Sequence, residues 1–295
     1  MAGSRVAAVL ATGLYFGEGP RWHEDRLWFS DFYDHAVKTV DLDGRVEVVL
    51  RVDGQPSGLG WLPDGRLLLV SMLERKVLRR DADGLAEHAD LSQVATFHTN
   101  DMVVDEHGRA YVGNFGFDLH TFEREKGGRA LYTEPLPPTA DLARVDLDGS
   151  VHVAAEGLRF PNGAVITPDG RTLVVGETLG RRLTAFDVGD DGTLTNRRVW
   201  AALGRRLPDG ICLDADGHIW VANPIAPECY LVSEGGEVVD VVATDQRCYA
   251  CMLGGPDGRH LFMLTAAASD PDIASASRTG HVLVATVDVP HAGRP

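Results

Sequence analysis

The sequence predicts an all-β fold, a six-bladed β-propeller with four antiparallel strands in each blade. Three observations lead to this prediction: a short phrase recurs six times in the 295 residues, the apolar runs are short, and Asp-Gly or Gly-Gly turn signals separate them. In the phrase a small or acidic residue stands beside Pro or Gly, and an apolar run follows about eight residues and a turn later. One position of the phrase varies, and it is occupied in turn by Glu18, Ser57, Asn100, Asn162, Asp209 and Ala250.

The spacing of the phrases indicates one blade per copy. The successive spacings are 39, 43, 62, 47 and 41 residues, and all but the third lie near the roughly 40–50 residues of a four-stranded propeller blade. The third spacing contains an insertion at about residues 116–141, with Phe117, Phe122 and a proline-rich run. Because insertions in repeat folds lie on one face, often the binding face, we expect this segment near the site.

The expected strands follow the phrases in order. The apolar runs after the six phrases lie at residues 27–29, 67–70, 110–112, 173–175, 219–221 and 261–263. The fifth unit contains a whole blade, with runs at 211–213, 218–222, 229–233 and 238–243. The sixth unit is one strand short, since only 261–265 and 281–289 follow its phrase. We expect the apolar residues 6–11 to supply the missing strand, which closes the ring of a single domain, 1–295, and removes exposed strand edges.

Composition excludes several classes of partner. The formal net charge of −15 disfavours nucleic acids and anionic membranes, since both require a positive surface. No apolar stretch approaches the ~20 residues of a membrane span. The four cysteines are too few for a disulfide framework, so a cytoplasmic, reduced protein is expected. Cys248 and Cys251 have the spacing of zinc ligands, but the chain has no second such pair, and we interpret them as half-buried strand cysteines.

Two sets of polar residues have different positions in the repeat. The aspartates in Asp-Gly, mid-unit, are interpreted as hairpin-turn residues; they are Asp64, Asp169, Asp216 and Asp257. The phrase residues instead precede the innermost strand, where the blades converge on the axis. Asn162 and Asp209 could each be a turn residue, but Glu18 cannot be explained in that way. Their matching positions in blades 1, 4 and 5 therefore predict one shared site.

The chemistry of these three side chains indicates a cation. Two carboxylates and an amide oxygen that converge on the axis would repel one another unless a cation lay among them. Hard oxygen ligands without thiolate or imidazole suit Ca²⁺, Mg²⁺ or Mn²⁺. Glu18, Asn162 and Asp209 are therefore candidate metal ligands, and Asn100 and Asn114 are further amide candidates near the mouth.

The motifs around these residues resemble the SMP-30/gluconolactonase/luciferin-regenerating enzyme-like family of six-bladed propellers, over nearly the whole chain. The motifs that carry the resemblance are residues 14–22 (LYFGEGPRW), 99–101 (TND), 160–163 (FPNG) and 208–214 (PDGICLD). The resemblance implies one divalent metal on the axis, bound by Glu18, Asn162 and Asp209. It also implies that Asn100 contacts the substrate, with Asp101 beside it at the metal mouth. Ca²⁺ is the expected ion, with Mg²⁺, Mn²⁺, Zn²⁺ and Fe²⁺ as alternatives.

Blade 3 departs from the pattern of the sugar-lactone hydrolases in this family. His98 stands where those relatives often have Arg, and the loop that often carries a sugar-binding carboxylate is largely apolar here. Asp118 is a candidate substitute for that carboxylate. Phe115 and Phe117 indicate a less polar substituent on the substrate, because a buried polar group left unpaired costs about 1–3 kcal/mol. The alternative is that these aromatic residues only anchor the loop.

The resemblance implies a metal-dependent hydrolase that opens a small-molecule lactone by attack of water. The ion would act as a Lewis acid on the lactone carbonyl. Asp209 and His98 are the candidate general bases; a metal-bound Asp209 would have a lowered pKa, whereas an unperturbed imidazole titrates near ~6.5. No Gly-x-Ser-x-Gly elbow occurs in the chain, which disfavours a serine nucleophile.

Three alternatives stay open at this point. The same scaffold could serve an esterase or phosphotriesterase, or an enzyme that opens or rearranges a ring in secondary metabolism. A non-catalytic calcium-binding propeller is the third. The non-catalytic alternative predicts a cation whose coordination positions are all filled by protein atoms, whereas an enzyme requires open coordination positions that face the mouth.

Overall fold

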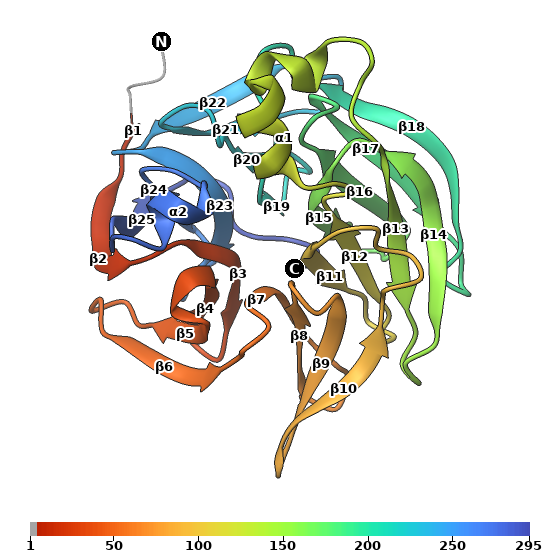
Figure 1. Ribbon diagram of the computed structural model, residues 1–295. Helices are drawn as coiled ribbons and strands as arrows, with labels where there is room; N and C mark the ends of the chain where they lie inside the picture. The colour runs from red at the N-terminus through yellow and green to blue at the C-terminus, as the bar shows by residue number, and fades with distance from the viewer. Residues whose placement is uncertain (1–4) are drawn as a thin grey trace.

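The computed structural model describes residues 5–295 and forms a ring of six four-stranded blades (Figure 1). The predicted six-bladed propeller is therefore confirmed, and the first four residues of the predicted domain 1–295 lie outside the described part. In each blade the strands are given from the axis outward. Blade 1 has β3 (Gly17–His23), β4 (Arg26–Asp31), β5 (Ala36–Val40) and β6 (Val46–Arg51); blade 2 has β7 (Pro56–Trp61), β8 (Leu67–Ser71), β9 (Lys76–Asp81) and β10 (Gly84–Asp90); blade 3 has β11 (Thr99–Val104), β12 (Ala110–Asn114), β13 (Ala140–Val145) and β14 (Val151–Leu158). Blade 4 has β15 (Pro161–Ile166), β16 (Thr172–Glu177), β17 (Arg182–Val188) and β18 (Leu194–Ala202); blade 5 has β19 (Ile211–Leu213), β20 (Ile219–Ala222), β21 (Glu228–Val232) and β22 (Val238–Ala243); blade 6 has β23 (Arg247–Gly254), β24 (His260–Ala266), β25 (Gly280–Thr286) and β2 (Ala8–Leu14).

Burial decreases from the axis outward, as the sequence pattern requires. Every residue of β11 and β15 is buried, because these innermost strands pack between neighbouring blades. The outermost strand β6 has no buried residue. The continuous apolar runs of the sequence therefore correspond to inner strands, and the polar, charged runs correspond to outer strands.

The mid-unit aspartates are turn residues, as predicted. Asp64 accepts a hydrogen bond from the backbone N–H of Arg66 (3.1 Å), and Asp169 does the same for Arg171 (3.0 Å). The intervening Gly65 has a φ of +85°, a conformation that favours glycine. In blade 5 the corresponding acceptor is Asp214, which the sequence interpretation had not identified.

Both ends of the described chain tie blades together. The N-terminal strand β2 pairs antiparallel with β25 and completes blade 6, which confirms the predicted ring closure. The preceding β1 (Arg5–Val6) pairs parallel with β22 of blade 5. At the other end, residues 290–295 cross the ends of the inner strands near the axis (Figure 1). Their backbone bonds to Gly258 in blade 6, Leu213 in blade 5 and Ile166 in blade 4.

The insertion between β12 and β13 folds into helix α1 (Leu119–Lys126) and a 3₁₀ turn, η2 (Gly128–Tyr132). It lies over the ring (Figure 1). Two other short elements, η1 (Phe32–Asp34) and α2 (Pro271–Ala274), follow inner or middle strands. None of the helices within residues 5–295 is both long and apolar enough to cross a membrane.

The four cysteines lie together in the core between blades 5 and 6, and all are free thiols. The Sγ atoms of Cys212 and Cys251 are 3.9 Å apart. The expectation of half-buried cysteines was wrong, since Cys248 and Cys251 are at most 1% exposed. In residues 5–295 no three His, Cys, Asp or Glu side chains form a group that could hold a metal ion.

Candidate functional site

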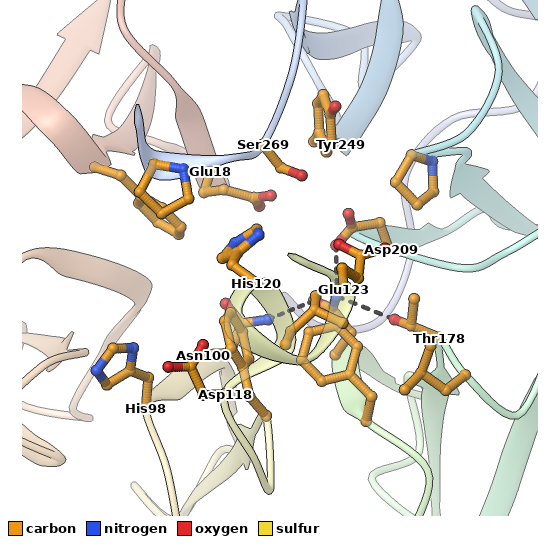
Figure 2. Close-up of a pocket in the computed structure, with 18 of the residues that line it drawn as sticks. Glu18, His98, Asn100, Asp118, His120, Glu123, Thr178, Asp209, Tyr249 and Ser269 are labelled. Carbon is orange, nitrogen blue, oxygen red and sulfur yellow. Dashed lines mark hydrogen bonds between the residues drawn. The ribbon is translucent and has the colours of Figure 1, made fainter. Parts of the chain in front are cut away.

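Four of the six varying phrase residues meet in one pocket at the axis. The pocket has a volume of about 600 Å³, and Glu18, Asn100, Asn162 and Asp209 all line it (Figure 2). Five of the six innermost strands shift register at the phrase, for example between Glu18 and Arg21 in β3. Such an irregularity re-aims a side chain, which explains why the phrase is rich in Gly, Pro and small polar residues.

A chain of hydrogen bonds joins the phrase residues of four blades. The Ser57 hydroxyl donates to Asn100 Oδ1 (3.2 Å), and Asn100 Nδ2 donates to Asn162 Oδ1 (2.9 Å). Asn162 Nδ2 in turn donates to Asp209 Oδ1 (2.5 Å) and to the Thr178 hydroxyl (3.2 Å). These hydrogen bonds thus connect blades 2 to 5 at the axis, and they fix the orientations of the two amide side chains.

The floor of the pocket concentrates negative charge. Burial raises the pKa of Glu18 well above its ordinary value, and the carboxylates of Asp209 and Asp101 raise it further. Burial also raises the pKa of Asp209; the hydrogen bond from Asn162 opposes this and Asp101 reinforces it. Because desolvation and mutual repulsion both disfavour ionised carboxylates, a cation among these oxygens would stabilise the site.

Asp101 has a different environment from the other predicted site residues. Its Oδ1 accepts hydrogen bonds from Arg21 Nη2 (2.9 Å) and from the backbone N–H of Met102 (2.7 Å). It lies beside the pocket rather than along its lining. Asp101, predicted at the metal mouth as a candidate substrate-binding residue, pairs instead with a buried guanidinium, and its role in substrate binding stays a prediction.

The blade-3 loop contributes fewer site residues than predicted. Asn114 does not line the pocket, because its amide donates to the Asp141 carbonyl (2.7 Å) and its carbonyl accepts from the Gly116 N–H (3.0 Å). Phe117 also lies outside the lining and packs edge-on against Phe122. Phe115 does line the pocket.

Asp118 lines the pocket but is the N-cap of α1, where it accepts from the Thr121 N–H (3.0 Å). Helix capping is thus the role that the sequence interpretation missed for this carboxylate. Its candidacy as a sugar-binding group is weakened, because one oxygen already has a backbone partner.

His98 lies on the blade-3 side of the pocket, across from Asp209 (Figure 2). Its ring stacks on Phe97 with centroids 4.0 Å apart. Burial lowers the pKa of His98, and the carboxylate of Asp118 only partly opposes this. The shift favours the neutral imidazole, which leaves a ring nitrogen able to accept a proton but makes His98 a weaker base than an unperturbed histidine.

Several lining residues were not predicted from the sequence. His120 and Glu123 project from successive turns of α1 over the pocket (Figure 2), and burial lowers the pKa of His120 and raises that of Glu123. Their i,i+3 spacing places them on one helix face, but this signal requires knowing that the insertion is helical. Tyr249 precedes the variable position of the sixth phrase and could have been found from that register.

The predicted metal ligands fit a cation by charge and donor type. Glu18 and Asp209 supply two buried carboxylates, and Asn162 supplies an amide next to them. In the structure the carbonyl of Asn162 accepts from Asn100, so its lone pairs are shared between this bond and any further partner. Their role as ligands stays a prediction.

The comparison with protein families gives one match, to the family described as SMP-30/gluconolactonase/LRE-like region, over residues 16–267. A pentonolactonase of Haloferax volcanii is 26% identical, over 98% of this chain and 96% of that protein. A 6-deoxy-6-sulfogluconolactonase of Pseudomonas putida is 25% identical, over 98% and 97%. The solved structure of a calcium-binding protein, regucalcin, from Agrobacterium tumefaciens superposes with a TM-score of 0.79 at 21% identity, over 100% and 99%. At that identity the likeness shows the fold alone.

Proposed function

This chain belongs to the SMP-30/gluconolactonase/LRE-like family, and we propose that it is a hydrolase that opens a lactone ring. The observation that carries the proposal is the pair of buried carboxylates, Glu18 and Asp209, at the floor of a pocket large enough for a small molecule. Relatives that match nearly the full chain are named as lactonases, which supports this reaction class.

We further propose that the floor holds one divalent cation, with Glu18, Asn162 and Asp209 as its protein ligands. Two carboxylates that are otherwise unfavourably buried support this, and a structural relative is named as calcium-binding. Hard oxygen donors favour Ca²⁺, with Mg²⁺, Mn²⁺, Zn²⁺ or Fe²⁺ as alternatives. Such an ion, when bound, supplies Lewis-acid polarisation of a carbonyl oxygen.

The side chains of the protein would then orient the substrate and move a proton. Asn100 lines the pocket with its amide fixed by Ser57 and Asn162, which suits it to position the lactone. Water attacks the carbonyl carbon, the ring C–O bond breaks, and the proton released by water is taken by a base and returned to the departing alkoxide. His98 and Asp209 are the candidate bases, and the neutral imidazole of His98 is competent at neutral pH.

An ester or phosphotriester hydrolase on the same scaffold is the second candidate. The apolar upper walls of the pocket favour it over the sugar-lactone pattern, since Phe115, Phe160 and Leu131 line the space where polar partners would be needed. A fully ligated, regulatory calcium site is less well supported, because the pocket leaves open space above the floor. The cytoplasmic location and the small-molecule partner stay predictions.

The test is hydrolysis of a panel of sugar lactones, an aliphatic γ-lactone and an aryl ester, measured by proton release after chelation and re-addition of single metals. Glu18→Gln and Asp209→Asn should each lower kcat/KM by about 10²-fold or more, the size expected for loss of transition-state charge stabilisation. Asp169→Asn is a matched control, because Asp169 occupies the same Pro-Asp-Gly tripeptide as Asp209 but lies in an exposed turn. Activity that survives in both floor variants would reject the proposal.

A further inference from the structure

The upper part of the pocket is built for an apolar group. We propose, on the basis of the lactone-opening function above, that the natural substrate is a lactone with an aryl or similarly bulky apolar substituent rather than a polyhydroxylated sugar. The lactone ring faces the polar floor, and the substituent lies between two aromatic walls.

The first wall comes from blades 1 and 6. Phe16 contacts Phe32, Tyr33 and Tyr249, with ring centroids 5.4, 6.1 and 4.7 Å apart. All four rings line the pocket. They come from three separate segments, so the wall is fixed by tertiary packing and does not depend on one mobile loop.

The second wall comes from blades 3 and 4. Phe97 stacks on His98, and Phe115 packs edge-on against Phe160 with centroids 4.6 Å apart. In a ring of six, blades 3 and 4 stand opposite blades 6 and 1 (Figure 1), and the residues of both walls line the same pocket. The insertion adds Leu119 and Leu131 from above. Phe115 packs against both clusters, so a flat apolar ring that enters the pocket meets aromatic residues from blades 1, 3, 4 and 6.

Several polar groups of the upper pocket already have partners. Asp118 caps α1, and Arg124 lies 3.6 and 3.7 Å from the carboxylates of Asp270 and Asp272. The Gln55 amide donates to the sulfur of Met72 at 3.6 Å. Several sugar hydroxyls brought into this space would lose hydrogen bonds to water and find few replacements, and such unpaired groups oppose binding.

One hydroxyl stands out as available. Tyr249 is 2% exposed, and its hydroxyl lies near Arg247 and Ser269 without a hydrogen bond of good geometry among residues 5–295. It lines the pocket and belongs to the first wall. Together with His120 and Glu123 on α1, and with His98 and Arg247 in the lining, it can satisfy a few polar atoms on the substituent.

The experiment compares γ-phenyl-γ-butyrolactone with unsubstituted γ-butyrolactone, glucono-δ-lactone and xylono-γ-lactone by proton release, with the wild-type chain and the most effective metal. One added methylene in an apolar pocket changes kcat/KM by about 10- to 200-fold, so the phenyl lactone should exceed the unsubstituted one by at least about tenfold. Both sugar lactones should be slower than the phenyl lactone. Faster opening of a sugar lactone would overturn this inference and leave the proposed function intact, whereas no opening of any lactone with any metal would reject the proposed function itself.

Variants of two phenylalanines in the same insertion region test the walls. Phe115→Ala should reduce the ratio of phenyl to unsubstituted kcat/KM by about tenfold, the low end of the effect of a methylene-sized change. Phe117→Ala is the control, since Phe117 packs against Phe122 outside the pocket lining, and should keep the ratio. Far-UV circular dichroism checks folding, and Phe115→Leu replaces the alanine variant if that one unfolds. An unchanged ratio in a folded Phe115 variant would count against the proposal.

Discussion

Replacing Arg21 by Met should destabilise the propeller more than any exposed arginine could. The guanidinium of Arg21 lies between the innermost strands of blades 1, 2 and 3, and the residue is 4% exposed. It donates to the carboxylate of Asp101 (2.9 Å) and to the carbonyls of Leu59 (2.9 Å), Pro20 (2.7 Å) and Met102. One side chain therefore joins the innermost strands of blades 1, 2 and 3.

The magnitude follows from these contacts. Removing one partner of a buried ion pair costs about 3–5 kcal/mol, because the other charge is left uncompensated. The three carbonyls also lose a donor, which costs more only where water cannot enter. Methionine keeps much of the aliphatic packing, so we expect the free energy of unfolding to fall by about 4 kcal/mol, mostly from the unpaired carboxylate.

Urea denaturation in the presence of a chelator, followed by circular dichroism, measures this change without the contribution of a bound ion. The control is Arg66→Met, since Arg66 and Asp64 form an exposed pair with 40% and 51% of their side chains accessible; its cost should stay below about 1 kcal/mol. Arg21→Met combined with Asp101→Asn should recover part of the loss. A cost below about 1 kcal/mol for Arg21→Met alone would refute the reasoning, because it would mean that the buried carboxylate needs no cation.

Two further predictions concern the floor and the ring seam. The pKa of Glu18 is raised in the folded state, so its contribution to stability is full below the ordinary carboxyl pKa and is lost as pH rises through the raised value. The metal-free Glu18→Gln variant should therefore melt at a higher temperature than metal-free wild type at pH 8, and at the same temperature near pH 4. A lower melting temperature of the variant at pH 8 would contradict this prediction. Divalent ions should raise the melting point of wild type but not of the variant. Deleting residues 1–14 removes β2 and exposes the edge of β25, so light scattering should detect association. Deleting residues 1–7 removes the two-residue pairing of β1 with β22 and keeps β2, so this control should stay monodisperse. Equal behaviour of the two truncations would argue against ring closure by β2.

The fold was predictable because turn signals within each repeat mark where its strands end. Short apolar runs, Asp-Gly turns such as Asp64-Gly65, and the phrase recur at blade-length spacing, and each is a local signal that needs no knowledge of distant contacts. Helix α1 was not predicted, since eight residues form too short a helix to show clear periodicity. It is stabilised by its cap and by packing on the ring.

The candidate site was most predictable where it coincides with the repeat, although His98, Phe115 and Asp118 were also predicted and line the pocket. Glu18, Asn100, Asn162 and Asp209 share one register, and the structure brings all four to the pocket. The roles of neighbouring residues depend on contacts between distant segments. Asp101 accepts a hydrogen bond from Arg21, which is 80 residues away in the chain. No residue spacing in the sequence predicts this ion pair.

The aromatic walls of the upper pocket also depend on contacts between residues that are distant in the sequence. Phe16 and Tyr249 stand two and one residues before the variable positions of the first and sixth phrases, so their approach to the axis could have been inferred. Their contact with each other and with Phe32 joins blades 1 and 6. That contact follows from closure of the ring, which the sequence indicates only after the number of blades is known.

The segment 290–295 adds backbone bonds to blades 4, 5 and 6 that the described parts of blades 1, 2 and 3 do not share. Its backbone bonds fasten blades 4, 5 and 6 to one another, so amide hydrogen exchange should find these blades opening as one cooperative unit. Asn162 and Asp209 stand on the fastened half, while Glu18 and Asn100 stand on blades 1 and 3. Slow breathing between the halves would then widen or narrow the polar floor, and an ion held across that boundary would suppress the breathing.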